Sequence, residues 1–437
     1  MSFEIPFSHI AEIIMGQSPK GEEVNNEGIG LPLLNGPTEF TDRYPAPVQH
    51  TAYAKKISLP GDILFCVRGS TTGRMNYSDQ KYCIGRGLAA IRGRNGYPTP
   101  YVKAVLETYL PKLLAAATGS TFPNVSKDLI NNIPVSVLPV ENACNISKLI
   151  ELQEEKVFTN NQINQTLEQM AQALFKSWFV NFEPVKAKMA ALEAGGSQED
   201  ATRAAMTAIS GKDADALVVF AREHPEQYAE LKATAELFPS AMQDSELGEI
   251  PAGWRTAIVE SVINRLKVKN TFSADCIKLF GQHPVLEQGA KIYQGYHDEE
   301  PSFNASLQSP MFIFGDHTCV MHLSTVPFDI SKNTLVLKGK IFNTYWTFFA
   351  LKGKQKFQEY KRHWSDLKVK QVVIPDENNG LLLTNYFASK CENLFGLLEQ
   401  NRKQNLILQN TRDTLLPKLL SGEITLPEAE QIISEEA

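Results

Sequence analysis

Two patterns of apolar and polar residues alternate along the chain. Residues 1–140 and 246–376 contain short apolar runs interrupted by Gly and Pro, such as 57–67 and 328–339. This pattern is typical of mixed α/β domains with many strands. Residues 141–183 and 377–424 instead place their seam residues at alternating steps of four and three, as a helix does when it pairs with another helix. We therefore expect the order globule, long helix, globule, long helix.

The two helical segments repeat each other at an offset of 241 residues, because adding 241 to the first seam gives the second. Ile133-Pro134 and Ile374-Pro375 share this offset. Two unrelated amphipathic helices are the alternative, but asparagine recurs at the same two seam positions, and a buried amide fixes register. We expect the helices to pair in antiparallel fashion through Asn160, Asn164, Leu167, Leu174, Asn401, Asn405, Leu408 and Leu415.

Two further segments complete the predicted organisation. Residues 184–245 are acidic and rich in Ala, with apolar residues at helical spacing, which predicts a small helical insert. Residues 425–437 are expected to form an acidic C-terminal tail. The predicted fold class is thus α+β: two strand-rich α/β globules related by an internal pseudo-twofold repeat, two long antiparallel coiled-coil helices and a helical insert.

Composition places the 437 residues among ordinary globular proteins, with 43% hydrophobic and 21% charged residues, enough for two to four domains. No apolar run approaches the roughly 18 residues of a membrane span, and no basic residue precedes Lys20 as in a signal peptide. We therefore expect a cytoplasmic protein that does not enter a membrane. The six cysteines stand singly, which argues against a disulfide framework or a thiolate zinc site.

The net charge of −6 hides a strong segregation of charge. Residues 43–103 hold ten basic and two acidic side chains, and residues 332–370 hold the same numbers. A solvated lysine-rich face would explain one such patch. Two equal patches, one in each predicted globule, favour contact with nucleic acid phosphates.

Motifs for catalysis are missing. The chain has no G-x-x-x-x-G-K-[ST] phosphate loop. Residues 85–90 formally match a dinucleotide fingerprint but occur late in a strand-rich segment with no helix pattern after them, so we do not interpret them as a cofactor site. His317, Cys319 and His322 alternate as strand ligands would, yet buried strand residues are the better interpretation. Asp366-Leu367-Lys368 has no evident acidic partner. We predict no catalytic residue and no metal site.

Several segments, taken in order, resemble the specificity subunit of type I DNA restriction-modification systems. The second globule keeps few of the first globule's motifs, and Glu141-Asn142 replaces the family's usual Glu-Gln. The segments that carry the resemblance are Gly16-Gln17-Ser18-Pro19, 31–36, 61–65, 67–74, 117–121, 132–135, 173–182, 248–254 and 415–424.

The resemblance implies that residues 1–140 and 246–376 are target recognition domains, each reading one half of a split site in double-stranded DNA. The helices 141–183 and 377–424 would then set the unread spacer. Two adenine methyltransferase (modification) subunits and two restriction/translocase subunits would be the partners. S-adenosylmethionine, ATP and Mg²⁺ would belong to those partners, with no cofactor in this chain.

Residues for DNA contact follow from the chemistry of base edges and phosphates. Arg86 and Arg92 align with Lys332 and Lys338 at an offset of 246 and are expected to contact phosphates. Exposed aromatic residues at the end of the first helix, namely Phe175, Trp178, Phe179 and Phe182, would suit a partner interface, with core packing as the alternative. The expected DNA contacts are Gln17, Ser18, Arg68, Ser70, Thr71, Thr72, Arg74, Arg86, Arg92, Lys332, Lys338, Lys354, Lys361 and Arg362.

Two other functions remain open from the residues alone. A self-contained DNA-modifying enzyme would transfer methyl groups or cut DNA without partners. A coiled-coil scaffold would bind only proteins, and a linear fall of log affinity for DNA with log salt would exclude it.

Overall fold

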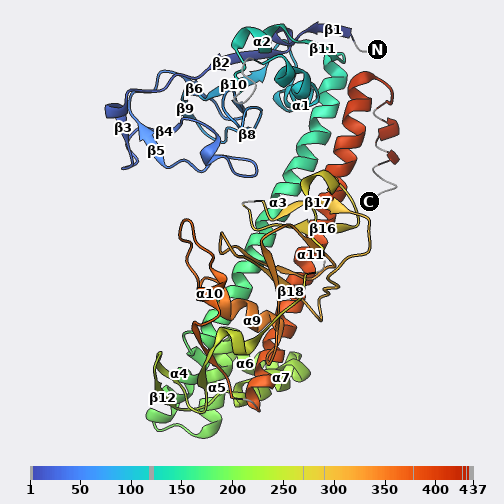
Figure 1. Ribbon diagram of the computed structural model, residues 1–437. Helices are drawn as coiled ribbons and strands as arrows, with labels where there is room; N and C mark the ends of the chain where they lie inside the picture. Colours follow the sequence, from blue (N-terminus) through green and yellow to red (C-terminus); the bar gives the residue numbers. More distant parts are fainter. Residues whose placement is uncertain are drawn as a thin grey trace. The chain divides into compact units, whose positions relative to one another are not determined.

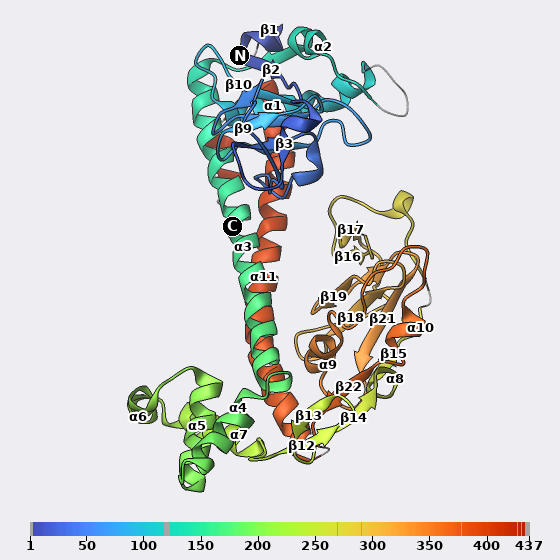
Figure 2. The ribbon, with the colours of Figure 1, turned by 90° about the vertical axis from the view of Figure 1, so that its left-hand side faces the viewer.

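The computed structural model describes residues 3–117, 123–268, 270–289, 291–376, 378–425, 427–429 and 431–432. It divides into two compact units, unit 1 (residues 1–161 and 403–437) and unit 2 (residues 162–402). Each unit contains a strand-rich domain and part of both long helices, so the expected α+β class is confirmed (Figures 1 and 2). Most of the 117–121 motif and residues 426, 430 and 433–437 of the predicted tail lie outside the described residues.

The strand-rich domain of unit 1 contains two sheets. The first is antiparallel, and its core strand β7 is buried along its whole length, as the continuous apolar run Ile63–Cys66 predicts. The second sheet holds a parallel pair, β4 with β9. The first sheet has the order β2 (Ala11–Met15), β10 (Leu88–Gly93), β7 (Ile63–Cys66), β8 (Met75–Tyr77). The second has the order β3 (Val24–Asn25), β5 (Gln49–Thr51), β4 (Leu31–Leu34), β9 (Tyr82–Ile84), β6 (Ile57–Ser58).

Helices and one strand pair complete this domain. Helix α1 (Thr99–Ala115) packs its buried face, including Tyr101 and Val105, into the same apolar core as the first sheet. Helix α2 (Lys127–Asn132) begins at Ser126, whose hydroxyl accepts the N–H of Leu129 as an N-cap. β1 (Phe3–Pro6) pairs with β11 (Pro134–Val137) where the domain leads into the first long helix.

Unit 2 repeats this architecture in the same order. Its first sheet is again antiparallel, its second again contains a parallel pair (β16 with β20), and a buried helix α9 (Thr344–Leu351) takes the place of α1. The first sheet has the order β15 (Ile263–Arg265), β21 (Thr334–Gly339), β18 (Met311–Gly315), β19 (Met321–Ser324), and the second β17 (Tyr293–His297), β16 (His283–Leu286), β20 (Asp329–Ile330). The other elements are β12 (Met242–Ser245), β13 (Gly248–Pro251), β14 (Arg255–Ile258), α8 (Val259–Val262), α10 (Trp364–Leu367) and β22 (Gln371–Ile374).

The long helices are α3 (Val140–Phe179) and α11 (Asn379–Ser421), and they pair in antiparallel fashion within each unit, as predicted. In unit 1 the amide nitrogen of Asn160 donates to Asn405 Oδ1 at 2.8 Å. In unit 2 the amide nitrogen of Asn401 donates to Asn164 Oδ1 at 2.9 Å. Asn401 is the repeat counterpart of Asn160, and Asn405 is that of Asn164. Each hydrogen-bonded pair therefore joins one asparagine to the counterpart of the other. The remaining predicted seam residues, Leu167, Leu174, Leu408 and Leu415, are buried or half-buried.

One detail of the predicted repeat is wrong. The N–H of Phe7 donates to the carbonyl of Ile133, and the N–H of Val259 donates to the carbonyl of Lys370. Ile133 therefore corresponds to Lys370, an offset of 237, and not to Ile374. The Ile-Pro pairs match in sequence because proline is frequent where a strand begins or ends, and not because they hold equivalent places.

Four helices lie where the sequence predicts a helical insert. Met206, Leu217 and Leu231 form a small core of their own, so the insert is a folded module and not a linker. Ser197 and Asp200 form a capping box that starts the second of these helices. The helices are α4 (Glu183–Glu193), α5 (Gln198–Ser210), α6 (Ala214–Glu223) and α7 (Pro225–Leu237).

The predicted partner interface at the end of α3 is wrong, because its aromatic side chains are buried. Phe175, Trp178, Phe179 and Phe182 are between 1% and 7% exposed and belong to the main core of unit 2. Their rings pack against aromatic residues that come from distant parts of the sequence. These partners include Phe238, Trp254, Trp346, Phe349, Tyr386 and Phe387.

In the part of the chain that the structure describes, no helix combines the length and the apolar character of a membrane span.

Candidate nucleic-acid interface

Loops from both sheets of unit 1 meet at one end of the recognition domain. The registers Met15–Ala89 and Cys66–Leu88 bring the end of β2 and the end of β7 to the start of β10. The parallel pairing of Leu34 with Ile84 brings the end of β4 to the same place. We call residues 16–19, 35–37, 67–74 and 85–87 the motif edge of unit 1, because they contain most of the sequence motifs of this domain.

Three backbone hydrogen bonds hold this edge together. The N–H of Gln17 donates to the carbonyl of Ile84 at 2.8 Å, and the N–H of Gly85 donates to that of Leu34 at 2.8 Å. The N–H of Val67 donates to the carbonyl of Gly87 at 3.0 Å. The motif segments, separated by up to 70 residues in sequence, thus form one surface.

Polar side chains line a hollow of about 520 Å³ at this edge. Ser18 Oγ donates to Asn35 Oδ1 at 3.1 Å and accepts the N–H of Arg86 at 3.1 Å. Asn35 Nδ2 donates to Gln49 Oε1 at 3.4 Å, and Arg86 is exposed. Amides and guanidinium groups are the side chains that match adenine and guanine edges. Of the residues that line this hollow, Ser18 and Arg86 were predicted, whereas Asn35 and Gln49 were missed, although Asn35 stands in the 31–36 motif. The predicted Gln17 is exposed on the same edge but does not line the hollow.

Glycine is required at this edge by close packing. A Cβ on Gly85 would lie 2.4 Å from Asn35 Oδ1, and a Cβ on Gly87 would lie 2.4 Å from the carbonyl oxygen of Asn35. No side chain fits at either distance. The Gly85-Arg86-Gly87 turn therefore presents Arg86 while its neighbours pack against the β4 loop.

The 67–74 loop divides its predicted residues into two groups. Thr72 Oγ1 donates to the carbonyl oxygens of Gly69 and Pro123, at 2.7 and 2.9 Å, and so closes the loop. Arg74 lies against the carbonyls of Pro37 and Phe40, both at 3.4 Å. Arg68, Ser70 and Thr71 are exposed, and their contact with DNA stays a prediction.

Arg92 and Lys338 hold equivalent places, as the offset of 246 predicts, because each precedes the last residue of β10 or β21. Arg92 forms an ion pair of 2.7 Å with the buried carboxylate of Asp62. Burial raises the pKa of Asp62, and hydrogen bonds from Leu59 and Arg92 oppose that rise. Lys338 donates to Ser309 Oγ at 2.8 Å. Both cations therefore have partners within the chain, and their contact with phosphates stays a prediction.

Unit 2 forms the same edge with the same three backbone hydrogen bonds. The N–H of Phe272 donates to Ile330, that of Ser331 to Leu286 and that of Asp316 to Asn333, at 3.0, 3.0 and 3.3 Å. These are the counterparts of the bonds from Gln17, Gly85 and Val67. We call residues 272–273, 287–289, 316–320 and 331–333 the motif edge of unit 2.

The side chains on this second edge are different. Lys332 is exposed in the place of Arg86. Gln288 Oε1 accepts the N–H of His317 at 3.0 Å, and its carbonyl accepts Thr318 Oγ1 at 2.8 Å. Gln288 was missed because only the parallel pairing of β16 with β20 brings it here. His317 lies in the loop, whereas His322 lies on β19, and the described residues contain no metal-binding group of three or more His, Cys, Asp or Glu side chains.

The predicted cations between α9 and α10 adjoin this edge through Asp316. The N–H of His363 donates to the carbonyl of Asp316 at 2.8 Å, and Arg362 Nε lies 4.0 Å from its carboxylate. Lys361 forms an ion pair of 2.6 Å with Asp366, and Lys354 is exposed.

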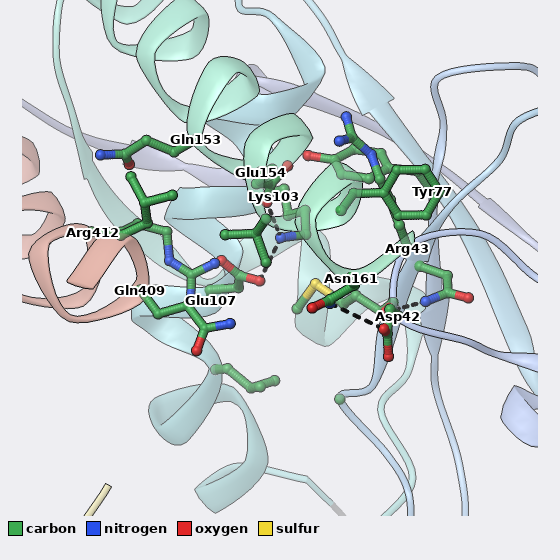
Figure 3. A pocket seen from close by; sticks show the side chains of 17 residues that line it. Asp42, Arg43, Tyr77, Lys103, Glu107, Gln153, Glu154, Asn161, Gln409 and Arg412 are labelled. Atoms are coloured by element: carbon green, nitrogen blue, oxygen red, sulfur yellow. Dashed lines mark hydrogen bonds and ion pairs between the residues drawn. The ribbon is translucent and has the colours of Figure 1, made fainter. Parts of the chain in front are cut away.

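A second hollow, of about 400 Å³, lies within unit 1 where the recognition domain meets the two long helices (Figure 3). Lys103 on α1 donates to Glu107 and to Glu154 on α3, both at 2.7 Å. Burial alone would lower the pKa of Lys103, but the two carboxylates hold it above its ordinary value. Arg412 reaches the same site from α11. Because Lys103 is paired with carboxylates from α1 and α3, we interpret this site as a joint and not as a DNA contact.

Comparisons with known proteins agree with the motifs. The family model for the type I restriction modification DNA specificity domain matches residues 5–169. The type I restriction enzyme HindI specificity subunit of Haemophilus influenzae is 29% identical over 85% of this chain and 88% of that protein. The putative type I restriction enzyme MjaX specificity subunit of Methanocaldococcus jannaschii is 35% identical over 32% of this chain and 33% of that protein.

Two solved structures are also similar. The HsdS subunit from Thermoanaerobacter tengcongensis shares 30% identity over 35% of this chain and 37% of that chain, with a TM-score of 0.31. The type I restriction-modification S subunit from M. genitalium shares 13% identity over 96% of both chains, with a TM-score of 0.49. Over residues 5–169 the family model, and along most of the chain the curated relative, show that this chain is similar to the DNA specificity subunits of type I restriction-modification systems.

Proposed function

We propose that each motif edge reads one half of a bipartite DNA target, and that the paired helices set the unread gap between the halves. Specificity subunits are non-catalytic, so the chain supplies recognition and not chemistry. One observation carries the proposal. The two edges share three backbone hydrogen bonds but present different polar side chains, such as Arg86 in one and Lys332 in the other.

The physical argument concerns which groups distinguish bases. Backbone geometry places a side chain at a groove, and the donors and acceptors on that side chain select the base. An edge with Gln17, Asn35 and Arg86 offers amides and a guanidinium group, which suit adenine and guanine. An edge with Gln288 and Lys332 offers a different set. Two edges with the same backbone hydrogen bonds but different side chains therefore suit two different half-sites.

The partners follow from the family. We propose that the chain assembles with two methyltransferase subunits and two restriction/translocase subunits, and that S-adenosylmethionine, ATP and Mg²⁺ bind to those partners. DNA as the target places this assembly in the cytoplasm. The described residues of this chain hold no group of three or more metal-ligating side chains.

The test is modification mapping. The full chain is expressed with its methyltransferase partner, and single-molecule sequencing locates modified adenines in host DNA. We expect methyladenine at one motif made of two short defined halves with a constant number of unread base pairs between them. Deletion of this chain alone removes that modification.

Two results would contradict the proposal. Modification that persists without the chain assigns recognition to another protein. Modification at a single continuous motif means that only one edge reads DNA. A further result would favour the scaffold alternative, namely a logarithm of the DNA affinity that does not fall linearly with log salt. Phosphate contacts release counterions and therefore produce such a fall.

A further inference from the structure

An unusually basic loop projects from the motif edge of unit 2. It comprises residues 352–362, between α9 and α10, and we call it the basic loop. Lys352, Lys354, Lys356, Lys361 and Arg362 give it five positive charges, against the single carboxylate of Glu359.

Hydrogen bonds to His363 and to Asp316 hold the base of this loop. His363, with no exposed surface, lies 3.3 Å from the Gln355 amide nitrogen through Nδ1 and accepts the N–H of Gln358 through Nε2 at 3.4 Å. The N–H of Trp364 donates to the carboxylate of Asp316 at 2.9 Å. Because Asp316 also belongs to the motif edge, the loop is anchored directly to the surface that we assign to DNA.

The tip of the loop presents aromatic side chains to solvent. Tyr360 is fully exposed, and Phe357 is 57% exposed. Tyr360 also adopts φ of 57°, in the left-handed region. A bulky residue rarely adopts this conformation, and exposing its ring to water does not stabilise the free protein. A folded base that presents an unfavourable aromatic tip indicates that the ring contacts another molecule.

The charges around the ring identify the class of that molecule. Lys352, Lys361 and Arg362 lie near the carboxylates of Glu168, Asp366 and Asp316, whereas Lys354 and Lys356 are exposed. The exposed lysines fit the phosphates of a nucleic acid, and an aromatic ring close to them in the same loop can reach the bases. DNA-binding proteins insert apolar or aromatic wedges between base pairs and thereby open a stacked step. An acidic protein partner would satisfy the cations but would not require an exposed ring at the centre.

We propose that Tyr360 inserts into a base-pair step within or beside the half-site that unit 2 contacts. This inference rests on the proposed function and adds to it a distortion of the DNA. Lys354 and Lys356 of the basic loop hold nearby phosphates, and the ring replaces part of the stacking that the opened step loses.

The test uses the full chain in complex with its methyltransferase subunits and a DNA duplex carrying its mapped target. 2-Aminopurine, which brightens when it unstacks, is placed at successive positions along the unit 2 half-site. We expect one position to brighten on binding. Tyr360→Ala should abolish that signal and weaken binding roughly 5- to 150-fold, the range for one base–aromatic stack. Tyr360→Phe should retain both, because the ring and not the hydroxyl inserts.

Controls separate this inference from the proposed function. Leu279→Ala removes another exposed apolar side chain of unit 2. Leu279 follows Lys278, which forms a β-bridge with Tyr296. This variant should change neither the 2-aminopurine signal nor the affinity. Lys356→Gln should lower the slope of log affinity against log salt, whereas Tyr360→Ala should leave that slope unchanged. If Tyr360→Ala binds as tightly as the wild type and no position brightens, the wedge is wrong while bipartite recognition stands. If the wild-type complex modifies no bipartite motif, the proposed function itself fails.

Discussion

The two motif edges differ in a way that separates scaffold from specificity. Backbone hydrogen bonds from Gln17 and Phe272 fall at the same places in the two units, although their side chains have nothing in common. The same holds for Gly85 and Ser331. Bonds made by the main chain survive any change of side chain, so an edge can acquire new base contacts without loss of its shape.

The joints between each recognition domain and the helices differ even more. In unit 1, Lys103 and Glu154 meet across the joint as a buried ion pair. The Thr99 and Thr344 hydroxyls accept the N–H of Gly93 and of Gly339, so these two threonines are equivalent. Lys103 therefore corresponds to Phe348 and, by the offset of 241, Glu154 corresponds to Phe395; both phenylalanines lie in the aromatic core. The same attachment is therefore made by ions in one unit and by apolar packing in the other. Apolar packing stabilises by burial alone, whereas buried ions stabilise only when every charge finds a partner.

The largest expected effect is loss of the aromatic core of unit 2. Trp178→Ala removes a side chain that is 1% exposed and should destabilise unit 2 by about 3–5 kcal/mol, the usual range for a buried aromatic residue. All four tryptophans lie in unit 2, so tryptophan fluorescence during urea unfolding follows this unit alone. Val180→Ala, at a neighbouring position with 54% exposure, serves as control. A shift below 1 kcal/mol for Trp178→Ala would mean that the core does not hold the unit together.

The ionic joint should respond to a change in charge rather than to a change in volume. Lys103→Met leaves Glu107 and Glu154 without their shared cation, and breaking such a pair costs about 3 kcal/mol. Hydrogen exchange in α1 and the first half of α3 measures the loss, because unit 1 has no tryptophan.

A companion variant decides whether the charge is the cause. Adding Glu107→Gln and Glu154→Gln to Lys103→Met removes the uncompensated charges and should restore most of the protection. Exposed Lys112→Met should have little effect. If the triple variant is no better protected than Lys103→Met alone, the joint depends on the lysine stem and not on its charge.

The sequence predicts the long helices well because their signal is local. A seam at steps of four and three needs only neighbouring residues, and the offset of 241 makes Asn401 and Asn405 the counterparts of Asn160 and Asn164. Because the helices are antiparallel, Asn160 meets Asn405 and Asn164 meets Asn401. Burial of Trp178 stood only as the alternative to a partner interface, because its partners, such as Trp346, come from distant segments. A local pattern shows that a helix end is apolar, but it does not show which surface covers it.

The candidate site was predictable in part for the same reason. The motifs indicate which loops matter, and Gln17 and Arg86 could be chosen by residue type. Asn35 and Gln288 reach the edges only through non-local strand pairing, in which β4 lies parallel to β9 and β16 lies parallel to β20. Strand order of this kind depends on contacts far apart in sequence, which no short motif contains.

Single substitutions at the two edges test whether each reads its own half-site. Arg86→Ala should relax the half read by unit 1, and Lys332→Ala the half read by unit 2, each with a loss of about 1–3 kcal/mol in discrimination if the residue contacts a base. Modification mapping with each variant measures the change. If Lys332 contacts only phosphate, its variant instead weakens binding to all sequences equally. Relaxation of the same half by both variants would contradict the assignment of one edge to each half.

The smallest effect concerns pH and again contrasts the two joints. Burial lowers the pKa of His322 well below its ordinary value, and the charges of Arg402 and Lys352 lower it further. Its other polar neighbours are the Tyr293 hydroxyl, at 3.1 Å, and Glu168. Between the lowered pKa and about 6.5, the unfolded chain binds a proton that the folded chain does not.

The stability of unit 2 should therefore fall as the pH falls below about 6.5, by up to about 1.4 kcal/mol per pH unit from this group. Asn76 occupies the counterpart position in unit 1, opposite Leu64 as His322 lies opposite Ile313. His322→Asn gives unit 2 the residue of unit 1 and should flatten the pH dependence between pH 7 and pH 5, read by tryptophan fluorescence in urea. An unchanged slope would assign the acid sensitivity to other groups, and the two joints would then differ in packing but not in titration.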